Sequence, residues 1–191
     1  YYFKIAALYF YMEMVIVVIL LFLLSLLTFV AVYALVMLFI YRVPLVPTEK
    51  KVAQKMIELA SLAPQKKVYE LGSGTGVILF YAEKQCPQAQ YVGYEILRPA
   101  VIYAQIKKFL TQSHIRFRCE DFFKADLSDA DIIFCYLFGH IMDRFHTEIF
   151  PCLRPGTKII SHGFQIKKLQ PVHMEKVGKA KIWVYEKKDE L

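Results

Sequence analysis

The sequence predicts an α/β domain, a mostly parallel β-sheet with helices on both faces, preceded by an N-terminal transmembrane helix. Two observations carry this prediction. Near the N-terminus, 28 consecutive residues from Met14 to Tyr41 contain no charged side chain. After them, short apolar runs typical of buried strands alternate with longer helical segments. The remaining part, about 150 residues, suits one domain with a single core.

The uncharged segment is long enough to cross a lipid bilayer. As a helix it would measure roughly 42 Å, whereas the hydrocarbon core of a bilayer is about 30 Å thick. No convincing signal-peptide cleavage site follows it, and apolar residues on every face are unusual for a core helix of this length. We therefore expect a membrane segment over residues 1–41, with the span itself at about 14–41.

The charges that flank the span predict its orientation. Arg42, Lys50, Lys51 and Lys55 follow it, whereas only Lys4 precedes it. By the positive-inside rule, the C-terminal domain faces the cytoplasm. From Arg42 onward the chain has 23 Lys and Arg (24 − 1) against 16 Asp and Glu (17 − 1). This surplus suits an anionic membrane surface or an acidic partner, although dispersed lysines are also typical of an ordinary solvated surface.

The rest of the chain reads as a linker with an amphipathic helix over residues 42–63, followed by the main domain over 64–191. Thr48 is a candidate N-cap for the first helix. The predicted strands cover residues 67–71, 90–95, 115–120, 131–137, 157–163 and 179–187. Further helices are expected to begin near Gly76, Pro99 and Ile141. Residues 163–178 leave room only for a short strand or an irregular segment. This alternation predicts a Rossmann-like, doubly wound sheet.

A glycine-rich loop, "ELGSGTG", follows the first predicted strand. Glycines permit a tight turn and let a ligand lie against bare backbone, with the N-terminus of the next helix directed at it. A dinucleotide-binding loop would need a glycine at Val77, and Glu70 would repel a pyrophosphate. The carboxylate suits a ligand with a cationic amino group and no phosphate, such as S-adenosylmethionine. The loop residues expected at this ligand are Glu70, Gly72, Ser73, Gly74 and Gly76.

Two further strand ends carry acidic residues that fit the same ligand. Glu95 closes the second strand and could accept both hydroxyls of a ribose. Asp121 follows the third strand and could accept a hydrogen bond from an adenine amino group, with Phe122 flanking the ring. Each acidic residue also has an ordinary structural alternative: a surface carboxylate for Glu70, a helix cap for Glu95, and an N-cap or turn residue for Asp121.

Together these motifs resemble a known family. The E-x-G-x-G-x-G loop, "GYE" and "DFF" are similar to those of class I, seven-strand S-adenosylmethionine-dependent methyltransferases, over most of residues 64–187. A narrower resemblance comes from "VPLVPTEKKVAQKMIELA", "DFFKADLSDADIIFCYL" and "LRPGTKIISHGF". With the membrane segment, these stretches resemble a membrane-anchored lysine methyltransferase group. That group includes the enzymes that modify the adenine nucleotide translocase and the ATP synthase c subunit, and their bacterial relatives.

The resemblance implies a membrane-anchored enzyme that transfers methyl groups from S-adenosylmethionine to a lysine of a protein, which can itself be membrane-embedded. It also implies that Thr48 helps to close the cofactor pocket. Two alternatives stay open: a methyltransferase of a small or lipid-like molecule, and a non-catalytic membrane-bound module that retains the cofactor fold. Nothing in the sequence determines the oligomeric state.

The acceptor site is expected at the end of the fourth strand, in "CYLFGH". Many methyltransferases of nitrogen atoms or nucleic acids carry Asn or Asp there, followed by two prolines and an aromatic residue. This chain does not, so we expect no nucleic-acid substrate. Tyr136 and His140 are the catalytic candidates and Phe138 a lining residue, while His162 is undecided. Tyr136 could orient an amine or hold a methylated ammonium against its ring, or it could pack in the core. His140 could accept a proton, or simply begin a helix.

The four cysteines predict no metal site. They are widely separated, and no pair has the two-residue spacing typical of zinc and redox motifs. We interpret them as reduced packing residues.

Overall fold

The computed structural model describes residues 2–41 and 48–189, and the chain divides into two compact units, Tyr1–Leu45 and Val46–Leu191. The first unit contains one continuous helix, α1 (Tyr2–Tyr41). Within its segment Tyr9–Val36, the most apolar 18 residues have a mean hydropathy of 3.3 and are unburied, so the segment is long and apolar enough to cross a membrane. The hydroxyls of Ser25 and Thr28 donate to helix carbonyls one turn earlier, which satisfies them without water.

The second unit is built on a seven-stranded sheet with the order β3-β2-β1-β4-β5-β7-β6. β1 to β5 are mutually parallel, whereas β7 is antiparallel to both of its neighbours. This mostly parallel, doubly wound sheet confirms the predicted fold class. The strands are β1 (Lys67–Leu71), β2 (Gln90–Tyr94), β3 (Arg116–Arg118), β4 (Ile132–Cys135), β5 (Lys158–His162), β6 (His173–Val177) and β7 (Ala180–Glu186).

Four α-helices and two 3-10 turns accompany the sheet. They are α2 (Lys50–Ala60), α3 (Val77–Gln85), α4 (Arg98–Thr111), η1 (Phe122–Lys124), α5 (Gly139–Glu148) and η2 (Phe150–Cys152). The predicted N-cap Thr48 is wrong by one residue: Glu49 holds that position, makes no capping hydrogen bond through its side chain, and its carbonyl accepts the first helical bond, from the Ala53 N–H. The short β6 fills the segment in which only a short strand was expected.

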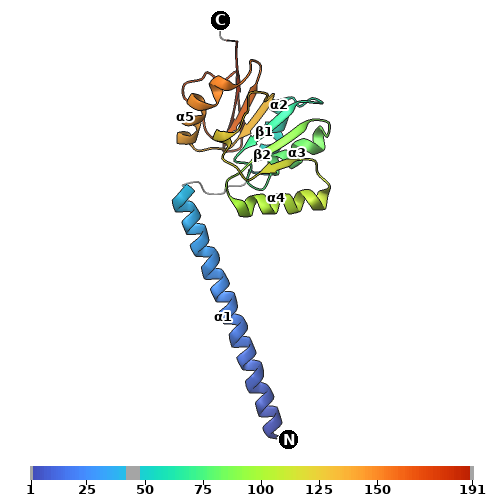
Figure 1. Cartoon of the computed structure of the whole chain (residues 1–191), viewed down its shortest axis with the longest axis vertical. Coiled ribbons are helices and arrows are strands. Elements are labelled where there is room, and N and C mark those ends of the chain that lie inside the picture. Colours follow the sequence, from blue (N-terminus) through green and yellow to red (C-terminus); the bar gives the residue numbers. More distant parts are fainter. Residues whose placement is uncertain (1, 42–47, 190–191) are drawn as a thin grey trace. The chain divides into compact units, whose positions relative to one another are not determined.

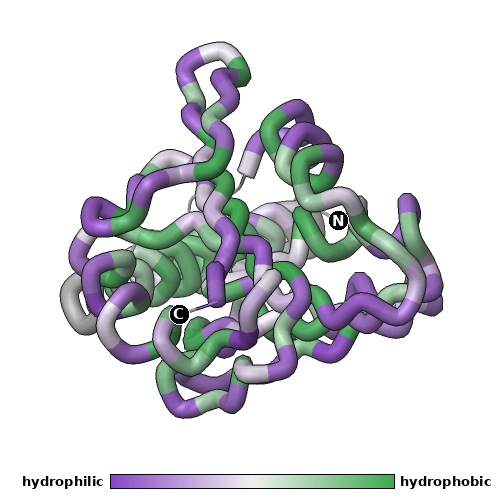
Figure 2. The backbone as a smooth tube through the Cα atoms, turned by 90° about the horizontal axis from the view of Figure 1, so that it is seen from above, coloured by the Kyte–Doolittle hydropathy of each residue, from purple (hydrophilic) through white to green (hydrophobic). Residues whose placement is uncertain are grey.

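Two hydrophobic clusters cover opposite faces of the sheet. One joins α2 and α3 to residues such as Val68 and Ile160, and the other joins α5 to their strand neighbours Tyr69 and Ile159. This division follows from the alternation of side chains along a strand. Figure 1 shows α3 and α4 on one side of the sheet and α5 on the other. Coloured by hydropathy, the backbone carries hydrophilic residues on its helices as well as in its loops (Figure 2).

All four cysteines are free. Cys86 and Cys135 are buried and pack in the two clusters, as expected. The packing prediction was wrong for Cys119 and Cys152, which are exposed because Cys119 lies just beyond the end of β3 and Cys152 ends η2.

Candidate active site

The glycine loop lies at the carboxyl end of β1, beside the point where the strand order reverses between β1 and β4. In an open parallel sheet this is the place where ligands bind. Gly72, Gly74 and Gly76 have φ angles of +71°, +52° and +74°, a region that favours glycine. The backbone N–H groups of Gly72 and Ser73 both donate to the Tyr94 carbonyl at 2.9 Å. The loop is therefore fixed by backbone bonds to the end of β2.

The loop residues do not all face the same way. A Cβ on Gly76 would lie 2.5 Å from the Phe117 ring, so this glycine allows α3 to begin against β3. The Ser73 side chain is buried, and its Oγ would lie 2.7 Å from a Cβ on Gly93. Gly72 would meet the Leu137 side chain at 3.1 Å, which places the segment after β4 directly beside the loop.

Glu70, in β1, is buried, with 6% of its surface exposed. Among the described residues, its Oε2 has no hydrogen-bond partner. Burial raises the pKa of this carboxyl well above its usual range, and the nearby Glu95 raises it further, against a lowering by the Leu79 backbone N–H. A buried acidic group without a cation at hand fits a ligand that brings a positive charge of its own. The amino group of S-adenosylmethionine is such a charge.

Glu95 is also buried, and both of its carboxylate oxygens are engaged by the backbone. Oε2 accepts the Gly74 N–H at 2.9 Å. Oε1 accepts the N–H groups of Ile96 and Leu97 at 2.8 and 2.9 Å, just before α4 begins. The side chain therefore links the glycine loop to the start of α4. A carboxylate has about four acceptor sites, so beside these three donors about one site remains for a ribose hydroxyl.

Asp121 and Phe122 follow β3. The Asp121 Oδ1 accepts the Phe123 N–H at 3.0 Å, which makes Asp121 the N-cap of η1. Phe122 is 8% exposed and packs against Phe123 with ring centroids 4.5 Å apart. Both residues thus hold the turn that follows β3, and this turn shares the carboxyl edge of the sheet with Glu70 and Glu95.

A cluster of aromatic side chains lies at the carboxyl ends of β4 and β5. The Tyr136 and His162 rings have centroids 3.9 Å apart, and Phe164 lies 6.3 Å from Tyr136. Phe138 contacts Phe164 at 5.4 Å and the His140 ring at 6.5 Å. We call Tyr136, Phe138, His162 and Phe164 the aromatic cluster. His140, in the first turn of α5, is exposed at its rim.

His162 is the most buried member of this cluster, with 8% of its surface exposed. Among the described residues its Nδ1 has no hydrogen-bond partner. Burial lowers the pKa of the imidazole, an effect that Glu49 partly opposes. The ring is therefore neutral at physiological pH, so an amine placed beside it meets no positive charge from this residue.

The sequence reasoning missed three residues of this site. Phe164 is held over the cluster because its N–H donates to the His162 carbonyl at 2.9 Å and its own carbonyl accepts from the Ser161 hydroxyl at 2.6 Å. Leu137 contacts the glycine loop, and Glu49 raises the pKa of His162. The pair of aromatic residues two positions apart in "HGF", mirrored by Tyr136 and Phe138, was the signal available for Phe164.

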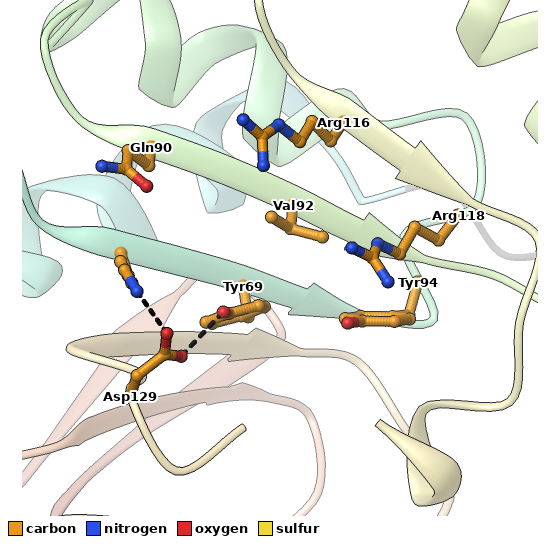
Figure 3. A pocket seen from close by; sticks show the side chains of 8 residues that line it. Tyr69, Gln90, Val92, Tyr94, Arg116, Arg118 and Asp129 are labelled. Carbon is orange, nitrogen blue, oxygen red and sulfur yellow. Dashed lines mark hydrogen bonds and ion pairs between the residues drawn. The ribbon is translucent and has the colours of Figure 1, made fainter. Parts of the chain in front are cut away.

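A separate hollow lies over the face of β1, β2 and β3 (Figure 3). It exists because the connection from β3 to β4 supplies only the turn η1, so α5 covers the other half of this face. Asp129 accepts hydrogen bonds there from the Lys67 ammonium and from the Tyr69 hydroxyl, the latter at 2.8 Å. The hollow shares none of its lining residues with the predicted cofactor-binding residues, although it reaches the ends of β2 and β3 at Tyr94 and Arg118.

The chain matches known proteins over its second unit. Residues 70–173 match the family described as ANTKMT methyltransferase domain. The chain is 32% identical over 145 residues to a protein-lysine N-methyltransferase of Saccharolobus islandicus (strain REY15A), covering 74% of this chain and 89% of that protein. It is 24% identical over 147 residues to the adenine nucleotide translocase lysine N-methyltransferase of Mus musculus, covering 76% of this chain and 63% of that protein.

Solved structures agree with this match. The RNA methyltransferase from Salinibacter ruber, in complex with S-adenosyl-L-homocysteine, is similar with a TM-score of 0.73 and 30% identity, over 76% of this chain and 96% of that one. The predicted resemblance to class I methyltransferases is thereby confirmed. Sequence, fold and the fit of the glycine loop lead to one conclusion: the chain belongs to the ANTKMT methyltransferase domain family, and it is a methyltransferase that uses S-adenosylmethionine.

Proposed function

We propose that this enzyme is a membrane-anchored protein-lysine N-methyltransferase whose catalytic domain lies on the cytoplasmic side. The observation that carries the lysine assignment is the aromatic cluster beside the glycine loop, which offers rings and a neutral imidazole to an incoming amine. The names of the relatives from Saccharolobus islandicus and Mus musculus, both lysine methyltransferases, support the same acceptor.

The cofactor half of the site is assigned to the ends of β1, β2 and β3. S-adenosylmethionine supplies a methyl group bound to a positively charged sulfur. Glu70 would bind the amino group of the cofactor, Glu95 its ribose and Asp121 its adenine, with Phe122 beside the ring. Gly72 and Gly74 would provide the bare backbone of the loop. Ser73 and Gly76 would act indirectly, because their contacts to Gly93 and Phe117 shape the loop.

The acceptor half is assigned to the ends of β4 and β5. A lysine must reach the methyl group without its proton, because only the neutral amine has a free electron pair. A half-buried aromatic surface favours the neutral form by desolvating the ammonium. Tyr136 would orient the amine through its hydroxyl, and the neutral His162 would avoid charge repulsion. His140, being exposed at the rim, would contact the substrate chain or pass the released proton to water.

The anchor is assigned to α1. Its apolar segment would cross the bilayer, and the basic residues that follow it favour a cytoplasmic domain. Tethering to the membrane raises the effective concentration of any target in the same bilayer. A membrane protein is therefore the substrate class that this architecture favours.

RNA is a second candidate acceptor, because the similar protein from Salinibacter ruber is described as an RNA methyltransferase. One experiment separates the possibilities. The full chain, reconstituted in lipid nanodiscs, would be incubated with S-adenosylmethionine labelled in its methyl group, together with membrane proteins, total RNA or extracted lipids. A Gly74→Asp variant is the control, because an added side chain and charge in the loop should abolish cofactor binding.

We expect label in the protein fraction, recovered as N-methyllysine after hydrolysis. Label in RNA alone or in lipid alone would show that RNA or lipid, and not a lysine, is the methyl acceptor. A wild-type protein that binds S-adenosylmethionine but labels none of the three fractions would favour the non-catalytic module.

A further inference from the structure

Helix α4 buries small residues and exposes large apolar ones, which is the reverse of the usual arrangement. Its buried residues are small, namely Ala100, Val101 and Ala104. Its large apolar residues point outward: the exposed fractions are 56% for Ile106, 84% for Phe109 and 73% for Leu110. A helix that serves only its own domain buries the large residues instead.

These outward residues form one continuous stripe. At 3.6 residues per turn, they fall within about 120° of the helix circumference. We call them the outer stripe of α4; its members are Ile102, Tyr103, Ile106, Phe109 and Leu110. An exposed apolar surface of this kind is rare on a soluble monomer and marks a contact with a partner or a membrane.

The surroundings of the stripe are basic. From Ile96 to Cys119 the sequence has five Lys and Arg and no Asp or Glu. Lys107 lies over the Phe80 ring of α3 at 4.2 Å, so its stem packs along the flank of α4 while its charge stays at the surface. Apolar residues flanked by cations, without anions between them, are typical of helices that lie in the interface of an anionic bilayer.

The tether also points to a bilayer. Eight residues separate the end of α1 at Tyr41 from the start of α2 at Lys50. A fully extended chain of this length reaches at most about 30 Å. If α1 crosses a membrane, the catalytic domain can never leave the vicinity of that membrane, and its apolar surface has lipid within constant reach.

We propose that the outer stripe of α4 lies in the interfacial layer of an anionic lipid bilayer, the one crossed by α1; this inference rests on the membrane anchorage proposed above. Arg98 begins α4 directly after Glu95, Ile96 and Leu97, at the carboxyl edge of the sheet. The docked helix therefore brings the open edge of the active site to the lipid surface, where side chains of a membrane protein emerge.

The test places one tryptophan at a time in the full chain, reconstituted in vesicles of phosphatidylserine and acyl-brominated phosphatidylcholine. Bromine quenches tryptophan emission only at short range. The background is Trp183→Phe, because Trp183 is the only native tryptophan and its Nε1 has no partner among the described residues. The reporters are Phe109→Trp in the outer stripe, Leu20→Trp in α1, and Val172→Trp as a matched control beside β6, at the opposite edge of the sheet from β3.

An interfacial helix buries its apolar face about 5–10 Å deep, so Phe109→Trp should lose about half of its emission or more to bromine, and Val172→Trp should lose none. Quenching of Leu20→Trp without quenching of Phe109→Trp would overturn the inference while leaving the anchorage intact. No quenching of Leu20→Trp would reject the anchorage itself. Blue-shifted but unquenched Phe109→Trp would overturn lipid docking in favour of a second copy or a protein partner.

The charge contribution is tested with the same reporter. Phe109→Trp should be quenched less in vesicles that lack phosphatidylserine, and less at high salt, because screening weakens the attraction of the basic residues. Equal quenching under all conditions would overturn the electrostatic part of the proposal.

Discussion

The two halves of the active site are built in different ways. The cofactor half, at the ends of β1 and β2, is fixed by the backbone: Gly72, Ser73 and Gly74 donate to the Tyr94 carbonyl or to the Glu95 carboxylate. The acceptor half, at the ends of β4 and β5, is formed by ring contacts such as that between Tyr136 and His162. Substitutions in the glycine loop should therefore damage fold and cofactor binding together, whereas those in the aromatic cluster should change the response to the acceptor alone.

The largest effect is expected at Gly76. In Gly76→Ala the new Cβ meets the Phe117 ring at 2.5 Å, at a φ of +74° that L-residues rarely adopt. Strain and overpacking together should lower the free energy of unfolding by about 2–4 kcal/mol. Thermal unfolding of the detergent-solubilised protein measures this loss. Gly139→Ala is the control, because nothing lies within 4 Å of a Cβ placed there. If both variants lost the same free energy of unfolding, the claim that the cofactor half is fixed by its backbone would be contradicted.

Among substitutions of the acidic residues of the site, Glu95→Gln should weaken cofactor binding the most. Both carboxylate oxygens accept backbone N–H groups, and an amide must turn its NH2 toward one of those donors. The loss of charge-assisted bonds and the new conflict should reduce affinity for S-adenosylmethionine about 100-fold. Calorimetric titration tests this, with the exposed Glu120→Gln as control. An unchanged affinity would mean that cofactor binding does not depend on the link that Glu95 makes between the glycine loop and α4.

Glu70→Gln should weaken cofactor binding but remove a pH-dependent loss of stability. Affinity for the cofactor should fall about tenfold, because one ion pair is lost. The pKa of Glu70 is raised in the folded protein, so the unfolded chain holds fewer protons than the folded one above the usual carboxyl pKa. Stability of the cofactor-free wild type therefore falls as the pH rises above about 4.5, up to the raised pKa.

The variant should lack this decline, as unfolding measured from pH 4 to pH 8, without cofactor, can establish. If the free energy of unfolding changed with pH in the same way for wild type and variant, the pKa of Glu70 would not be raised in the cofactor-free protein.

The smallest effect is expected in the acceptor half. Phe164→Leu removes one aromatic contact of about 0.5–1.5 kcal/mol, so the KM for a lysine acceptor should rise about 2- to 10-fold. The Kd for S-adenosylmethionine should stay constant. Phe150→Leu, whose ring stacks on His146 instead, is the matched control. A change in the Kd of the Phe164 variant would mean that the two halves are not independent.

The same contrast explains how far the sequence could be read. Alternating strands and helices predicted the sheet, and β1 falls on the expected residues because its apolar run is bounded by Lys67 and the glycine loop. The loop was recognisable because backbone geometry demands glycine. The aromatic cluster was recognised only in part, since contacts between Tyr136, just after β4, and Phe164, after β5, depend on strand order and follow no fixed spacing in the sequence. Ser73 and Gly76 were expected at the ligand; the structure adds that the Ser73 side chain packs against Gly93 and that a Cβ on Gly76 would meet the Phe117 ring.

The reversed faces of α4 have an evolutionary consequence. Because the buried residues of this helix are only three and small, its outward side chains can be exchanged with little loss of stability. Selection can then alter where the domain rests, or which assembly it meets, independently of methyl transfer. In such a protein the docking site of the enzyme and its reaction can evolve independently. One catalytic domain can then be reused among paralogues that differ mainly in the outer stripe of α4.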